Sequence, residues 1–144
     1  MAWILETSAS YSFVFLRLGL AVTFFLHSTQ QIFGWHGGRG LKAHLANWRD
    51  KQHIPIPIGA LGLFIEFFGS LALLIGFLTR PFALGLALFI IIAMLKSHAR
   101  HGFFLARRPG DASGIEYTLA LFLMAVALFV GGGGALSVDG LLSQ

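Results

Sequence analysis

The stretch that decides the fold is IPIGALGLFIEFFGSLALLIGFL, residues 56–78. Apart from Glu66 it carries no charged side chain, and it exceeds the ~20 apolar residues that a helix needs to cross a bilayer. Three glycines recur every seven residues in it: Gly62, Gly69 and Gly76. Glu66 lies four residues after the first of them and three before the second. Small residues let membrane helices approach closely, so this stripe predicts that Glu66 faces protein and not lipid.

Three further apolar stretches lie at about 11–33, 82–99 and 113–130. Short turns between such stretches allow antiparallel packing, so we expect an all-α integral membrane four-helix bundle, a single domain over residues 1–144. The fourth stretch is the shortest, and it spans a bilayer only if it begins near residue 112 or continues into the glycines at 131–134.

The connection between the first two spans contains LKAHLANWRD, residues 41–50. Leu41, Leu45 and Trp48 follow the i, i+4, i+7 spacing of one helix face, and Lys42 and Arg49 lie off that face. This pattern predicts a short helix lying in the membrane interface.

Composition supports a membrane protein and excludes several kinds of chemistry. Hydrophobic residues make up 56% of the chain and charged residues 11%, against about 25% charged residues in typical soluble domains. The chain has no cysteine, which excludes disulfides, cysteine-ligated iron–sulfur clusters and covalently attached c-type haem. Redox chemistry would therefore need a bound carrier or a partner protein.

The net charge of +4 is concentrated in two connections on the same side of the predicted bundle. This side would carry eight of the ten Lys and Arg residues: Arg39, Lys42, Arg49, Lys51, Lys96, Arg100, Arg107 and Arg108. The positive-inside rule then predicts cytoplasmic basic loops and both termini outside, in a bacterial or archaeal inner membrane. We expect these residues to meet the anionic headgroups of the lipid bilayer, with no nucleic acid as a partner.

Polar residues gather in the half of the bundle nearest these loops. By helical rise, Glu66 lies roughly 14 Å and His27 roughly 9 Å from the loop side, and Arg17 roughly 24 Å. The long side chain of Arg17 could reach toward Glu66. Other polar residues predicted on this side are Gln30, Gln31, Lys96, His98 and Glu116.

Two interpretations of these residues stay open. One is a hydrogen-bonded network that only fixes helix packing. The other is a polar pocket suited to a quinone headgroup, an anion or a proton. A metal shared by His98, His101 and Glu116, or a haem between His27 and His98, has weaker support, and we expect no metal site.

Four blocks of the chain, in this order and spacing, resemble the DoxX family of small four-helix membrane proteins. The blocks are LRLGLAVTFFLHSTQQIFGWHGGRG at 16–40, FIEFFGSLALLIGFLTRP at 64–81, HGFF at 101–104 and GIEYTLALFLMAVALFVGGGGALSVDG at 114–140. The resemblance maps the family's polar positions onto Arg17, His27, Gln31, Glu66, His98 and Glu116.

The resemblance implies a link to the quinone pool and a partner protein. Some members of the family are the membrane subunit of a thiosulfate:quinone oxidoreductase, and others belong to membrane-associated redox or stress-response complexes. On this basis we expect Glu66 and His27 to exchange protons as catalytic residues. Quinone-binding residues would be Arg17, Gln31, His98 and Glu116.

The function expected is therefore a membrane-embedded subunit of a redox system that binds quinone. The alternative is an accessory or scaffold subunit of a larger respiratory or stress-response complex, without chemistry of its own. Whether the chain is an enzyme by itself stays open at this point. Its expected partners are other membrane or redox protein subunits, and a homo-oligomer is a further alternative. A small transporter has less support, because the two halves show no internal repeat.

Overall fold

A computed structural model describes residues 2–108 and 110–143, and these residues form helices and no strand. The main helices are α2 (Ser12–Phe33), α4 (Ile56–Ile75), α5 (Thr79–Ala93) and α6 (Glu116–Gly131). The shorter elements are α1 (Ala2–Leu5), the 3₁₀ turn η1 (Trp35–Gly37), α3 (Leu41–Gln52), the π-helical turn η2 (Met94–His98), the 3₁₀ turn η3 (Ala99–His101) and α7 (Val138–Leu142).

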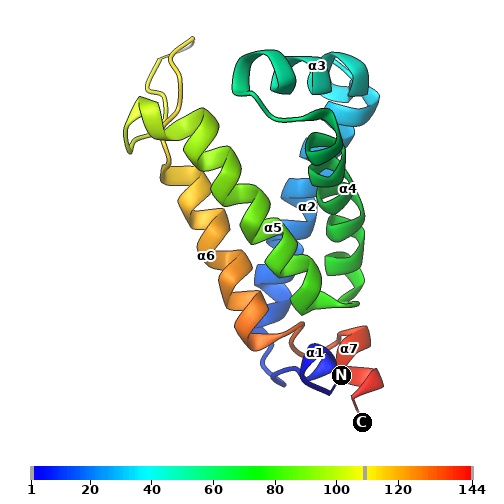
Figure 1. The fold of residues 1–144 in the computed structure, drawn as a ribbon. Helices are drawn as coiled ribbons and strands as arrows, with labels where there is room; N and C mark the ends of the chain where they lie inside the picture. The colour runs from blue at the N-terminus through cyan, green and yellow to red at the C-terminus, as the bar shows by residue number, and fades with distance from the viewer. Residues whose placement is uncertain (1, 109, 144) are drawn as a thin grey trace.

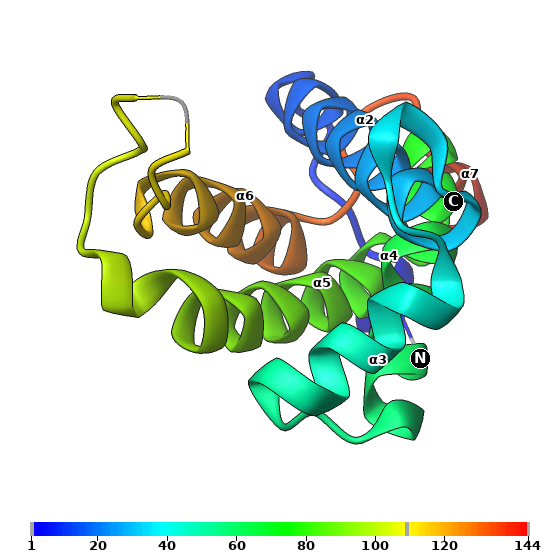
Figure 2. The ribbon, with the colours of Figure 1, turned by 90° about the horizontal axis from the view of Figure 1, so that it is seen from above.

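The four main helices form a bundle in which α2 packs chiefly on α4, and α5 on α6 (Figure 1). Both termini lie at one end of the bundle, beside α1 and α7, and we call this the terminal end. The opposite end carries α3 and the loop 102–115, and we call it the loop end. Viewed from above, α3 and α6 lie on opposite sides of α5 (Figure 2). The predicted topology, with both basic connections at the same end, is confirmed.

The glycine stripe of α4 is buried, as its spacing predicts. A side chain at Gly62 would meet the ring of Phe89, and one at Gly69 would meet Phe82. On the facing helix, Gly85 receives the side chain of Ile65 in the same way. Close packing of α4 on α5 therefore depends on glycines from both helices. The core beneath them is apolar: Leu20, Ala21, Phe24, Leu73, Ala83, Leu86, Ala87, Ile90, Leu121, Ala125 and Leu128.

The turn between α4 and α5 differs from the sequence prediction. We expected the second span to reach residue 78 and the third to begin at 82, but α4 ends at Ile75 and α5 begins at Thr79. Gly76 takes a left-handed conformation with φ of 70°, which ends α4. Leu78 is also left-handed, with φ of 46°.

The third and fourth spans also have different bounds. The α-helical part of the third ends at Ala93 and continues as a π turn and a 3₁₀ turn to His101. The fourth begins at 116 and not at 113, because the amides of residues 114–116 donate to the carbonyls of residues 102–104 and turn the chain back. Three segments are long and apolar enough to cross a membrane: Ser12–Phe33, Ile56–Ile75 and Thr79–His101. The apolar helix α6, with 16 residues, is shorter.

The short helix between the first two spans is confirmed as α3. It lies at the loop end and packs on the first turn of α4 (Figure 1). The contact is made where α4 has no side chain, since a Cβ at Gly59 would meet Leu45 at 3.0 Å and the Trp48 ring at 3.1 Å. This contact places one face of α3 over the interior of the bundle.

Candidate functional site

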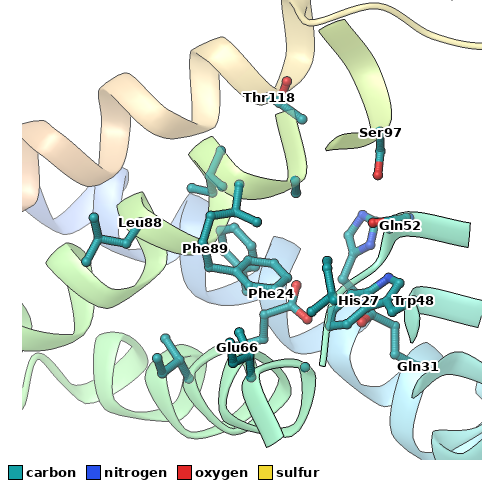
Figure 3. Close-up of a pocket in the computed structure, with 18 of the residues that line it drawn as sticks. Phe24, His27, Gln31, Trp48, Gln52, Glu66, Leu88, Phe89, Ser97 and Thr118 are labelled. Atoms are coloured by element: carbon teal, nitrogen blue, oxygen red, sulfur yellow. The ribbon is translucent and has the colours of Figure 1, made fainter. Parts of the chain in front are cut away.

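A cavity of about 440 Å³ lies at the loop end between α2, α4, α5 and α6, with α3 along its rim (Figure 3). The turn at 76–78 joins α4 and α5 at the terminal end, and the two helices diverge toward the loop end (Figure 1). Most of the lining is apolar, including Phe24 and Phe89. Its volume falls within the ~300–1,000 Å³ of small-molecule pockets.

Glu66 is the acidic residue of this cavity, and only 2% of it is exposed. Gln31 of α2 lines the same cavity. In Figure 3 the Glu66 side chain projects from α4 into the space bounded by Phe24, Phe89 and His27. The packed face that the glycine spacing predicts therefore borders a ligand-sized cavity.

Three polar atoms in the lining are buried and have no hydrogen-bond partner within the described part of the chain. They are Glu66 Oε2, Gln31 Oε1 and His44 Nε2, and they come from three different helices. Each buried polar atom left without a partner costs about 1–3 kcal/mol. Because natural proteins satisfy nearly all such atoms, three of them around one cavity are groups to which a ligand or water could bond.

His44 of α3 also lines the cavity, although the sequence did not assign it to a site. Its ring packs edge-on against Trp48, with ring centroids 4.5 Å apart, one helical turn along α3. Burial, together with the positive charge of Arg39, lowers the pKa of His44, so the neutral imidazole is favoured. The spacing of His44 and Trp48 was visible in the sequence, but their position over the cavity depends on the fit of α3 against Gly59.

Four of the six residues that the sequence assigned to a site line this cavity: His27, Gln31, Glu66 and His98. His98 lies in the π turn, and its Nδ1 is 3.0 Å from the carbonyl oxygen of Ser113. That contact joins the end of the third span to the loop that precedes α6.

The other two assigned residues lie elsewhere. Arg17 is buried at the terminal end, where its Nη2 donates to the Leu136 carbonyl at 3.1 Å and its guanidinium lies against Gly76. Gly76 is ten residues from Glu66, which corresponds to about 15 Å along α4. The expectation that Arg17 reaches toward Glu66 is therefore wrong. Among the described residues the ion pair that forms is Arg49–Asp50, at 2.8 Å on the surface.

Glu116 lies outside the cavity lining and is exposed. Its Oε2 accepts a hydrogen bond of 3.0 Å from the amide of Leu105. The contact fixes the loop 102–115 against the start of α6.

The terminal end contains two charged residues whose roles the sequence did not reveal. Asp139 of α7 is 1% exposed, and its carboxylate accepts from the amides of Leu78 at 2.7 Å and Thr79 at 2.8 Å. It thus caps α5 from a distant part of the chain. Arg80 is 6% exposed and donates to the carbonyls of Glu6 and Phe129, with its guanidinium 4.5 Å from the Trp3 ring centroid.

The sequence left open a metal site shared by His98, His101 and Glu116. Within residues 2–108 and 110–143, no three or more His, Cys, Asp or Glu residues lie together as a metal-binding group. Glu116 bonds to Leu105 and His98 contacts Ser113, so their observed contacts are with the backbone of the loop.

Three apolar segments of membrane-spanning length indicate a helical integral membrane protein, and the bundle encloses a largely apolar cavity with polar atoms in its lining. The DoxX family model matches residues 12–99, more than half of the chain, and the protein belongs to this family. The matched region contains α2 to α5 and most of the cavity lining, whereas Glu116 lies beyond it. No curated protein and no solved structure matches the chain.

Proposed function

We propose that this DoxX-family protein binds a quinone in the loop-end cavity, as the membrane-embedded subunit of a redox system. The observation that carries the proposal is the set of three unpartnered polar atoms, on Glu66, Gln31 and His44, in an otherwise largely apolar cavity. A quinone has a flat apolar ring with polar oxygens at two edges, so it needs apolar surroundings together with hydrogen-bond partners, and the cavity lining offers both.

The hydrogen-bonding groups of the cavity lining suit the reduced form of the ligand, the quinol. Gln31 Oε1 is an acceptor, and the unpartnered carboxyl oxygen of Glu66 can also accept, so both would receive hydrogen bonds from the hydroxyl groups of a quinol. A neutral His44 can donate or accept at Nε2, depending on its tautomer. The ring would lie among the aromatic side chains of Phe24, Trp48 and Phe89.

The cavity also has a lipid-side approach. Leu61 and Ile58 of α4 and Leu88 and Ile92 of α5 line it, and all four are more than 40% exposed on the helix surfaces. Exposed apolar side chains on spanning helices meet lipid tails, so a quinone could pass from the bilayer between α4 and α5. Its isoprenoid tail would remain there.

Reduction of the bound quinone to quinol takes up two electrons and two protons. The electrons would come from a partner redox protein, since the chain has no cysteine to ligate an iron–sulfur cluster. The protons would pass through Glu66 and His27, both of which line the cavity. We also propose, from the positive-inside rule, that the loop end faces the cytoplasm.

Tryptophan fluorescence offers a direct binding test. The chain has three tryptophans, and Trp48 lines the cavity, whereas Trp3 lies at the terminal end beside Arg80. Two single-tryptophan variants, each with the other tryptophans replaced by Phe, would be titrated in mild detergent with a short-chain ubiquinone. We expect saturable quenching of Trp48 and only weak, linear quenching of Trp3.

Equal, non-saturating quenching of the two variants would overturn the proposal. Saturable binding without any quinone reduction, in a complex isolated with an electron-donating partner, would favour the accessory or scaffold role. Quinone extracted with the purified wild-type protein would give independent support.

A further inference from the structure

A second hollow, of about 400 Å³, lies on the other side of His27 from the quinone cavity. It is lined by α2, η1 and the start of α6. Five of its seven lining residues carry polar side chains: Thr23, His27, Gln30, His36 and Tyr117. The quinone cavity, in contrast, is mostly apolar.

His27 and Tyr117 line both hollows, so their side chains form the wall between them. His27 comes from α2 and Tyr117 from α6, and these two helices pack on each other less closely than either packs on its main partner. The wall therefore consists of side chains across a loosely packed seam.

The second hollow reaches the loop-end surface. His36 lies in η1, just beyond the end of α2, and is exposed. The Gln30 amide donates to the His36 carbonyl at 3.3 Å, which holds this turn at the mouth. Thr23, at the inner end, is ten residues before the end of α2 and so lies about 15 Å deep.

Polar side chains at this depth are costly against lipid tails, since hydrocarbon offers no hydrogen-bond partners. Water entering from the loop end would meet them. A histidine in the wall can take a proton at one ring nitrogen and release one from the other. The same imidazole borders the water side and the quinone side.

We propose that the second hollow is a water-filled path that delivers protons from the loop-end surface to His27, and that His27 transfers them into the quinone cavity. The use of those protons rests on the proposed function. In that reaction one quinone takes up two electrons from the partner protein and two protons, and it becomes one quinol. The existence of the path does not rest on it.

The absence of native cysteine makes the path testable by single-cysteine labelling in vesicles. Thr23→Cys places a thiol in the hollow. Phe64→Cys is the matched control, because Phe64 is 53% exposed on α4, lines neither hollow and lies about 12 Å from the loop end. The probe is a charged, membrane-impermeant methanethiosulfonate added on the loop side.

We expect Thr23→Cys to react roughly fiftyfold faster than Phe64→Cys, because a charged reagent must pay at least ~2.5 kcal/mol to enter hydrocarbon. Equal, slow labelling of the two sites, in protein that still binds the ubiquinone probe, would overturn the path and leave quinone binding intact. Fast labelling of Thr23→Cys without ubiquinone binding would support the path and refute the quinone proposal.

A second pair of variants tests the wall. Ile65→Cys lies in the quinone cavity, and we expect the charged reagent to reach it slowly while His27 is present. Combining it with His27→Ala removes part of the wall, so its labelling should accelerate about tenfold, while labelling of Thr23→Cys stays fast. Unchanged labelling of Ile65→Cys would show that His27 does not separate the two hollows.

Discussion

The two ends of this bundle differ in what surrounds their buried polar side chains. At the terminal end, Asp139 and Arg80 have backbone partners from distant parts of the chain. At the loop end, Glu66, Gln31 and His44 leave polar atoms without partners around a cavity. The polar groups of the terminal end lie among packed helices and hold them together, whereas those of the loop end border a cavity that has room for a ligand.

The contrast is incomplete, because two residues of the terminal end also leave buried polar atoms without a hydrogen-bond partner in the described part of the chain. Arg17 Nε and Nη1 and Thr79 Oγ1 have no partner within the described residues. Neither residue lines the loop-end cavity or the second hollow, and the guanidinium of Arg17 is attracted by the carboxylate of Asp139. The two residues therefore belong to the packed end, although their hydrogen bonding is incomplete.

The largest expected loss of stability comes from introducing a side chain at Gly76, in the packed terminal end. Gly76→Leu would force a side chain into a left-handed residue and into the space held by the Arg17 guanidinium. We expect a loss of about 3 kcal/mol or more in the free energy of unfolding. The measurement is thermal unfolding in detergent. The matched control is Gly37→Leu, also left-handed but with open space around it, where only about 1 kcal/mol should be lost. Similar losses at both glycines would refute the close packing on Arg17.

The second effect tests the cap supplied by α7. Asp139→Ala leaves the buried amides of Leu78 and Thr79 without their acceptor. We expect a loss of about 2–3 kcal/mol in stability, with quinone binding retained in the protein that stays folded. Asp50→Ala is the control, because its ion pair with Arg49 is exposed to solvent and should contribute little to stability. An Asp139 variant as stable as the Asp50 variant would contradict the assigned role.

At the loop end, in contrast, replacing a buried polar residue is not expected to destabilise the protein. Glu66→Met replaces a buried carboxyl group by an apolar side chain of similar size, so stability should be unchanged or rise by about 1 kcal/mol. Quinone affinity should fall at least about tenfold, since a buried polar group of the ligand left without its hydrogen-bond partner costs ~1–3 kcal/mol. Parallel unfolding and ubiquinone titrations would measure both quantities. A destabilised variant that keeps its affinity would make Glu66 a packing residue.

The smallest effect concerns His44. Because burial and Arg39 lower its pKa, the unfolded chain takes up a proton at pH values where the folded chain does not. Its contribution to stability is therefore present at neutral pH and declines as the pH falls through the ordinary histidine range. An NMR titration should show His44 titrating below its ordinary value, and Trp48→Ala should raise it. An ordinary pKa in the wild-type protein would contradict the burial of this ring.

The four apolar stretches and α3 could be predicted from the sequence because length and periodicity are local properties. The burial of Glu66 followed from the same kind of pattern, through Gly62 and Gly69. Helix ends were less accurate, since the start of α6 depends on hydrogen bonds to residues 102–104. The cap from Asp139 joins residues 60 positions apart, and no sequence spacing reports it.

The site was partly predictable, because the depth of a residue along a helix is also a local property of the sequence. His27, Gln31 and His98 lie toward the loop end of their helices and Glu66 lies at the middle of α4, so helical rise alone places all four in the half of the bundle nearest the loop end. Arg17 was misplaced because a long side chain was assumed to extend toward Glu66, whereas the Leu136 carbonyl lies nearer. His44 was missed because its position depends on how α3 packs on α4.

The most direct test of the account is photocrosslinking with an azido-quinone, followed by peptide mapping. The account predicts adducts on α3, the first half of α4 and the second half of α5, near Trp48, Glu66 and Phe89. An excess of unmodified quinone should remove them, and Glu66→Met should weaken them. Adducts spread over lipid-facing residues, or gathered at the terminal end near Arg17, would contradict it.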